Sequence, residues 1–169
     1  FFDDVRVPVA NRIGEEGQGF AIAMATLDNS RPLTAMFSVG IARAALKDMV
    51  AYGNQRMQGG KKVLAFQGNQ FTLADLASDY LMVEKWLDYV AGLVDSGIDD
   101  MGMEASIAKM RATDLAMKMT TECVQFHGGY GYCQDYRAER MMRDAKITQI
   151  WEGTNQIHRQ LIGRSFVSK

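Results

Sequence analysis

The sequence has few of the residues that build metal sites or disulfide frameworks. Its 169 residues include only two cysteines and two histidines. Cys123 and Cys133 lie outside the C-x-x-C spacing of zinc and redox sites, and the histidines are far apart in the sequence. No apolar run approaches the roughly 20 residues of a membrane span, and no signal-peptide pattern is seen. We therefore expect no metal, no disulfide and no membrane partner.

The sequence also lacks an excess of charge of either sign. It has 19 Lys and Arg against 20 Asp and Glu, a net charge of -1. The basic residues are scattered, whereas proteins that bind nucleic acids present a basic stripe or patch. Nucleic acid is therefore not an expected partner. A hydrophobic content of 47% is enough for a substantial core.

The first residues have a strand-like alternation without a partner strand. Val5, Val7 and Val9 occupy every second position before a glycine-rich turn. A lone strand is unstable. Two interpretations are open: an extended arm that packs on a helical body, or the end of a sheet that belongs to a longer protein. The second is favoured.

The remainder has helical periodicity. Helical periodicity runs from Gly19 onward, and the first predicted helix has Pro32 in its first turn and ends at the Gly59–Gly60 pair. A second predicted helix has steps of three and four, and a third is rich in alanine. The final one covers about residues 154–166. These predict an all-α, up-and-down four-helix bundle behind a short extended segment. The apolar faces are Leu33, Phe37, Ile41, Ala45, Met49 and Tyr52 in the first helix, Leu73, Leu76, Tyr80, Val83, Leu87, Val90 and Val94 in the second, and Ile107, Leu115, Met119 and Cys123 in the third.

Two short motifs could carry chemistry. HGGYG, residues 127–131, is either a helix end with a turn or a loop whose backbone amides approach a flat or phosphorylated ligand. Glu152 stands where two helical patterns meet, before a helix capped by Thr154 or Asn155. It is either a surface charge near a helix start or, beside Ile147, Ile150 and Trp151, a partly desolvated general base.

Longer stretches resemble one family. VQFHGGYGYCQDYRAERMMRDAKITQIWEGTNQIHRQLIGR is similar to the C-terminal signature of flavin-dependent acyl-CoA dehydrogenases, and LDNSRP and VLAFQGNQFTLADLASD match that family in the same order. The resemblance covers nearly the whole chain. It implies that residues 1–15 are the tail end of the family's middle β-domain and residues 16–169 its C-terminal helical bundle domain.

The resemblance assigns roles residue by residue. Glu152 matches the base that removes the pro-R α-proton of an acyl-CoA while the β-hydrogen leaves as hydride to FAD. Asp28 and Arg31 match positions that hold the CoA portion of the substrate. The other matches are to FAD contacts, several of them on a neighbouring subunit: Arg56, Gln67, Gln125, Gly128, Gly129, Gly153, Thr154 and Gln156.

Each of these residues also has an ordinary interpretation. Arg56 could be a solvated helix-end charge, Asp28 an N-cap and Gln67 a cap. Two departures from the family pattern stand out. Gly59 replaces the phenylalanine that would pack against adenine, and Arg137–Ala138 replaces a proline-bearing turn. His127 and His158 match no family role and are interpreted as structural.

The predicted function is that of an FAD-dependent acyl-CoA dehydrogenase, an oxidoreductase. Its implied partners are the acyl-CoA substrate, an electron-transfer flavoprotein and further copies of the chain in a dimer or homotetramer. The implied location is the bacterial cytoplasm, or the mitochondrial matrix in a eukaryote. Two alternatives are open: a family member with oxidase or reductase chemistry, and a helical oligomerisation domain without activity of its own. Five methionines suit either an interface or the core: Met110, Met117, Met119, Met141 and Met142.

Overall fold

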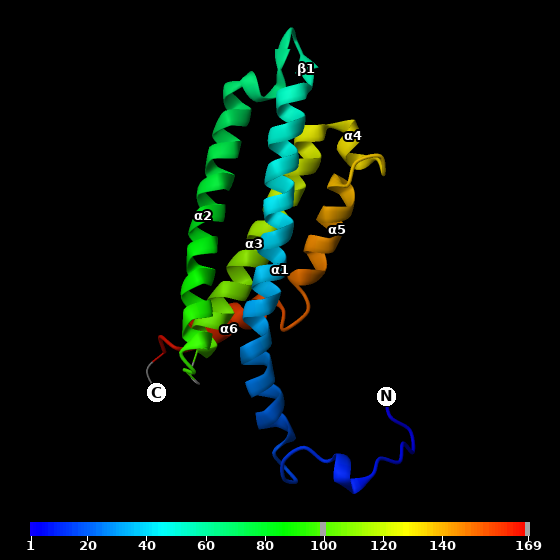
Figure 1. The fold of residues 1–169 in the computed structure, drawn as a ribbon, viewed down its shortest axis with the longest axis vertical. Coiled ribbons are helices and arrows are strands. Elements are labelled where there is room, and N and C mark those ends of the chain that lie inside the picture. Colours follow the sequence, from blue (N-terminus) through cyan, green and yellow to red (C-terminus); the bar gives the residue numbers. More distant parts are fainter. Residues whose placement is uncertain (99–100, 168–169) are drawn as a thin grey trace.

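A computed structural model describes residues 1–98 and 101–167. Three long helices run in alternating directions, and α3 lies at the centre, in contact with α1, α2, α5 and α6 (Figure 1). The described residues thus form an all-α bundle, which confirms the predicted fold class. The helices are α1 (Gly19–Gln55), α2 (Gln67–Asp95), α3 (Gly102–His127), α4 (Gly129–Tyr132), α5 (Ala138–Thr148) and α6 (Asn155–Arg164), with 3-10 turns η1 (Val9–Asn11) and η2 (Val63–Ala65).

Two short helices, α5 and α6, are found where the predicted bundle has one fourth helix. The helix α5 runs back along α3, and α6 lies across the opposite end of the bundle from α4 (Figure 1). Because α5 ends at Thr148 and α6 begins at Asn155, a six-residue connection separates them. This connection carries Glu152. No helix in the described residues combines the length and apolar character that a membrane span requires.

The helix α1 differs from the sequence-based prediction in two respects. Pro32 lies inside this 37-residue helix and not in its first turn. Leu33 and Phe37, expected in the core, are 66% and 54% exposed. The buried stripe instead consists mostly of small residues, Ala35, Ser38, Val39, Ala42, Ala45, Met49 and Gly53. Small side chains let α1 and α3 approach closely, which leaves the bulky side chains on the outer face.

The faces of α2 and α3 were predicted more accurately. Leu76, Tyr80, Leu87 and Val90 of α2 are buried, although Val94 is 39% exposed. In α3 the core includes Ala108, Ala112, Leu115, Ala116, Met119 and Cys123. Of the five methionines, Met119 and Met141 are buried and Met117 packs against the core. These three therefore support the core interpretation and not the interface one.

The Gly59–Gly60 pair forms the turn of a small hairpin between α1 and α2. Strand β1 (Met57–Gln58) pairs with β2 (Lys61–Lys62) in antiparallel register. Both glycines have left-handed backbones, with φ of 54° and 78°, as a two-residue type I′ turn requires. The departure from phenylalanine at position 59 therefore has a local reason: a bulky side chain would be strained at this φ.

The first 18 residues form no strand. Val5, Val7 and Val9 are 60%, 63% and 83% exposed. The short turn η1 and bends at residues 3–4 and 14–17 interrupt the extended chain. The described structure therefore shows an extended segment, as expected. Its assignment to the end of a β-domain remains a prediction.

Candidate active site

The connection that carries Glu152 has an unusual backbone. Glu152 and Gly153 are both left-handed, with φ of 57° and 88°. Thr154 then caps α6, because its Oγ1 accepts a hydrogen bond from the Ile157 amide at 3.4 Å. This confirms the predicted N-cap. A non-glycine residue in the left-handed region costs roughly 1 kcal/mol or more, so other contacts must hold Glu152 there.

The Glu152 carboxylate is half-buried and faces α1. Its Oε2 accepts a hydrogen bond from Ser30 Oγ at 2.6 Å, across 122 positions of sequence. Ser30 was not among the predicted site residues, since a serine inside a helix carries no local signal. The contact fixes one carboxylate oxygen and leaves the group able to accept a proton.

The apolar surroundings expected for Glu152 are only partly present. Ile147, Ile150 and Trp151 are 43%, 49% and 44% exposed, so they do not enclose the carboxylate in this chain. Trp151 contacts Phe37 of α1, with ring centroids 6.2 Å apart. The carboxylate therefore lies beside exposed apolar side chains from α1 and from the connection, a surface suited to an apolar ligand or another domain.

Asp28 and Arg31 lie on the same stretch of α1 as Ser30. They form an ion pair one helical turn apart, with Arg31 only 6% exposed. Asp28 is inside α1, so the N-cap interpretation is wrong. The structure brings this pair close to the Glu152 connection through Ser30. Its predicted contact with CoA remains untested.

Two buried basic residues lie behind the connection. Lys109 and His158 are both 0% exposed. Burial lowers the pKa of Lys109 to about 8, opposed by attraction to Asp114 and Glu152. Burial and the neighbouring Lys109 and Arg31 lower the pKa of His158 to about 4. At pH 7 Lys109 is therefore charged and His158 neutral.

The contacts of His158 define its tautomer. Its Nε2 lies 3.2 Å from the Glu152 carbonyl oxygen, which can only accept a hydrogen bond. The proton of the neutral ring is therefore on Nε2. His127 is also buried, with Nδ1 2.7 Å from the Cys123 carbonyl oxygen and its ring stacked on Tyr52. His127 fits the structural role expected of it, whereas His158 contacts the backbone of Glu152 itself.

A second group of predicted residues meets at the other end of the bundle. Arg56 is the C-cap residue directly after α1, and Gln125, Gly128 and Gly129 belong to the end of α3 and the start of α4. All four line a cavity of about 1130 Å³. The Arg56 guanidinium lies 5.6 Å from the centroid of the Tyr130 ring. This cavity combines a cation, aromatic rings and exposed glycine backbone.

The predicted cofactor residues are thus divided between two places. Gly153, Thr154 and Gln156 follow Glu152 at the α6 end, away from the cavity at the α4 end (Figure 1). Gln67 does not line the cavity, but it begins α2 directly after Phe66, which does. A single ligand bound to one copy of the chain does not readily account for both groups.

The fold and the site define a helical-bundle domain that presents one carboxylate at a helix junction and a separate glycine-lined cavity. The family model "Acyl-CoA dehydrogenase, C-terminal domain" matches residues 17–167. The chain belongs to the acyl-CoA dehydrogenase family.

Individual relatives agree with this assignment. The short-chain specific acyl-CoA dehydrogenase of Megasphaera elsdenii is 48% identical over 162 residues, which are 96% of this chain and 42% of that protein. The solved butyryl-CoA dehydrogenase of M. elsdenii superposes with a TM-score of 0.94 at 46% identity, over 99% of this chain and 43% of that one. An NADH-dependent acryloyl-CoA reductase of Anaerotignum propionicum is 41% identical over 168 residues, 99% of this chain and 42% of the reductase. The chain spans less than half the length of these relatives.

Proposed function

We propose that this chain supplies the catalytic base of an FAD-dependent acyl-CoA dehydrogenase, as the C-terminal helical part of a longer protein. The observation that carries this proposal is the Glu152 carboxylate. It lies at a left-handed turn, hydrogen-bonded by Ser30 at 2.6 Å and flanked by exposed apolar side chains. A carboxylate held in one place beside an apolar surface suits proton removal from a substrate carbon.

The chain contributes to α,β-desaturation of an acyl-CoA thioester. Glu152 takes the α-proton, and the electron pair of that C–H bond becomes part of the new C=C bond. The β-hydrogen would leave as hydride to FAD, the cofactor that the residues discussed below would hold and that would supply the two-electron acceptor. The Ser30 hydroxyl orients the carboxylate, and the Asp28–Arg31 pair on the same stretch of α1 is proposed to contact the CoA portion.

The cavity at the α4 end fits part of a dinucleotide. A Cβ placed on Gly128 or Gly129 would meet no atom within 4 Å, so the backbone there is open to a ligand. Arg56 would bind pyrophosphate oxygens, and a guanidinium does so bidentately. We propose that this cavity serves the FAD of a neighbouring subunit, while Gly153, Thr154 and Gln156 serve the FAD of their own subunit. The proposed assembly is therefore a two-fold homodimer, or a tetramer made of two such dimers. The proposed electron acceptor is an electron-transfer flavoprotein.

Replacement of Arg56 tests the cofactor role of the cavity. Arg56→Ala removes a cation from the cavity wall, so the full-length protein should lose FAD on dialysis while Glu152 keeps its contacts. Lys62→Ala is the matched control, because Lys62 is an exposed cation of the hairpin that follows Arg56 and does not line the cavity. The measurement is flavin absorbance per protein after dialysis. Equal FAD retention by the Arg56 variant and the control would count against the proposed contact.

Anaerobic addition of a saturated acyl-CoA tests the reaction itself. In the FAD-loaded full-length protein it should bleach the flavin absorbance and yield the α,β-enoyl-CoA. The acryloyl-CoA reductase among the relatives favours a second candidate, reduction of an enoyl-CoA. Flavin that keeps its colour with saturated acyl-CoAs, but is reoxidised from its reduced form by an enoyl-CoA, would support that candidate instead.

A further inference from the structure

Buried side chains donate hydrogen bonds to the backbone carbonyl oxygens of the left-handed turn at Glu152. The Gly153 carbonyl oxygen accepts a hydrogen bond from Lys109 Nζ at 2.8 Å. The preceding carbonyl, that of Glu152, accepts one from His158 Nε2. Both donors are completely buried. The two carbonyl groups that the left-handed residues turn inward are therefore both satisfied by side chains from helices, Lys109 from α3 and His158 from α6.

Burial of the Lys109 ammonium group costs free energy, because the charge is removed from water. An apolar side chain of similar length would avoid the free-energy cost of burying a charge. Acidic groups near it are Asp114 on α3 and Glu152 on the connection, and the nearby basic groups are Arg31 on α1 and His158 on α6. Lys109 Nζ nevertheless donates both of its hydrogen bonds to the turn and its end. The acceptors are the Gly153 carbonyl oxygen and Asn155 Oδ1, the latter at 2.9 Å.

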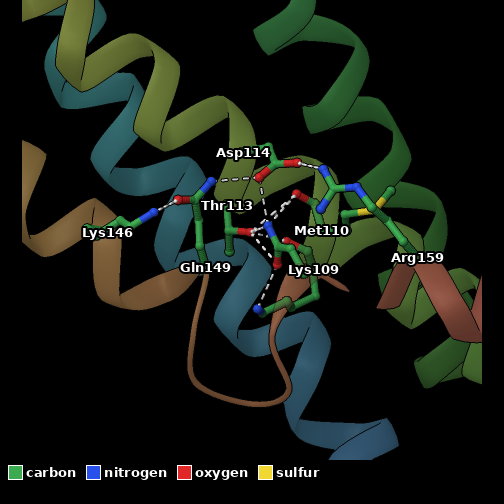
Figure 2. A network of polar contacts seen from close by, with 8 residues as sticks. Lys109, Met110, Thr113, Asp114, Lys146, Gln149 and Arg159 are labelled. Carbon is green, nitrogen blue, oxygen red and sulfur yellow. Dashed lines mark hydrogen bonds and ion pairs between the residues drawn. The ribbon is translucent and has the colours of Figure 1, made fainter. Parts of the chain in front are cut away.

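A polar network ties both ends of the turn to α3 (Figure 2). Gln149 Nε2, before the turn, donates to Asp114 Oδ1 at 2.6 Å. Asn155 Nδ2, after the turn, donates to the same oxygen at 2.7 Å and to Thr113 Oγ1 at 2.8 Å. The backbone N–H of Asn155 also donates a hydrogen bond to the backbone carbonyl oxygen of Gln149 at 3.1 Å. Each end of the turn thus has contacts with α3 besides those of Lys109, which bonds to Asn155 at one end and to the Gly153 carbonyl between the ends.

We infer that Lys109 is a positioning residue for the reaction: its ammonium fixes the Gly153 carbonyl and thereby holds the Glu152 carboxylate at Ser30 in the orientation that proton removal requires. This inference rests on the proposed role of Glu152 as base. Lys109 does not touch the substrate in this account. Loss of its contact would free the left-handed turn to relax and displace the carboxylate, and a displacement of about 1 Å can cost about 10²-fold in rate.

The test compares Lys109→Met with Thr120→Val in the FAD-loaded full-length protein. Thr120 is the matched control, since it is a buried polar residue of α3 whose hydroxyl bonds only to Ala116 and Met117 of its own helix. Both replacements remove a buried polar contact of α3. Only the Lys109 variant should lower kcat, by about 10²-fold, with KM for acyl-CoA nearly unchanged. It should also raise the kinetic isotope effect of an α-deuterated substrate.

Amide hydrogen exchange gives a readout that does not depend on turnover. A peptide covering residues 149–158 should exchange faster in Lys109→Met than in the unaltered protein, and at an unchanged rate in Thr120→Val. Should Lys109→Met fail to fold, Lys109→Gln, which keeps a shorter donor, takes its place. Failure of both variants to fold would overturn the positioning role in favour of a purely structural one.

The outcomes separate this inference from the proposed function. Normal kcat in the Lys109 variant, beside an inactive Glu152→Gln variant, would overturn the positioning role and leave the base assignment intact. Equal losses of kcat in the Lys109 and Thr120 variants would also overturn it. Full activity of Glu152→Gln would overturn the proposed function itself, whatever the Lys109 variant does.

Discussion

Glu152→Gln should abolish desaturation by the full-length protein while leaving FAD and acyl-CoA binding nearly intact. Glutamine keeps the shape of the side chain and can still accept a hydrogen bond from Ser30 through its amide oxygen. It cannot take a proton from the α-carbon. Loss of a general base should lower the rate by at least about 10²-fold. The measurements are kcat with a saturated acyl-CoA and the dissociation constant of a non-reacting acyl-CoA analogue.

A second carboxylate on the neighbouring helix provides the matched control. Glu139 of α5 is paired with Arg143 on the surface, away from the connection that carries Glu152. Glu139→Gln should therefore retain full activity. Turnover in Glu152→Gln comparable to that of this control would refute the base assignment. A loss of acyl-CoA binding equal to the loss of rate would point to a binding role instead.

Gly131→Ala should destabilise the fold strongly. A Cβ at this position would lie 2.5 Å from the Val124 carbonyl oxygen and 2.8 Å from His127 Cβ. The nearest atom belongs to the α3 backbone, which cannot move aside as a flexible side chain can. Overpacking of this kind typically costs about 1–3 kcal/mol, and contact with a backbone atom places this substitution at the upper end, about 3 kcal/mol. Guanidinium unfolding of the flavin-free protein measures the loss.

Gly129→Ala is the control for this prediction within the same motif. A Cβ on Gly129 would meet no atom within 4 Å, so its free energy of unfolding should change by less than about 1 kcal/mol. Similar stabilities of the two variants would mean that α4 does not pack as closely on the end of α3 as the structure shows. Because this packing shapes the cavity, the result bears on the cofactor site as well.

The sequence predicts the regular parts of the fold well. The steps of three and four in α2 identify its buried face, because each apolar residue there is large and the pattern extends over several turns. The pattern in α1 misleads, since its contact with α3 is made by small residues such as Ala35 and Ala42. Alanine and serine give little hydrophobic signal, so the bulky Leu33 and Phe37 were assigned to the wrong face.

Only those residues of the candidate site that belong to short sequence motifs can be predicted from the sequence. Glu152 and the glycines of residues 128–131 stand out because a carboxylate at a helix junction and a glycine cluster are local features. Ser30 and Lys109 do not stand out, because their contacts with the connection span 122 and 44 positions. A serine or lysine inside a helix is usually a surface residue, and only the packing of α1 and α3 against the connection gives these two their roles.

Exchange of the substrate α-hydrogen with solvent tests the role of Glu152 most directly. The FAD-loaded full-length protein is incubated with a saturated acyl-CoA in D₂O without an electron acceptor, and deuterium at the α-carbon is measured by mass spectrometry. The unaltered protein and Glu139→Gln should incorporate deuterium, because the base returns a solvent-derived deuteron to the substrate, whereas Glu152→Gln should incorporate none above the uncatalysed background. Incorporation by Glu152→Gln at the rate of the unaltered protein would contradict the account.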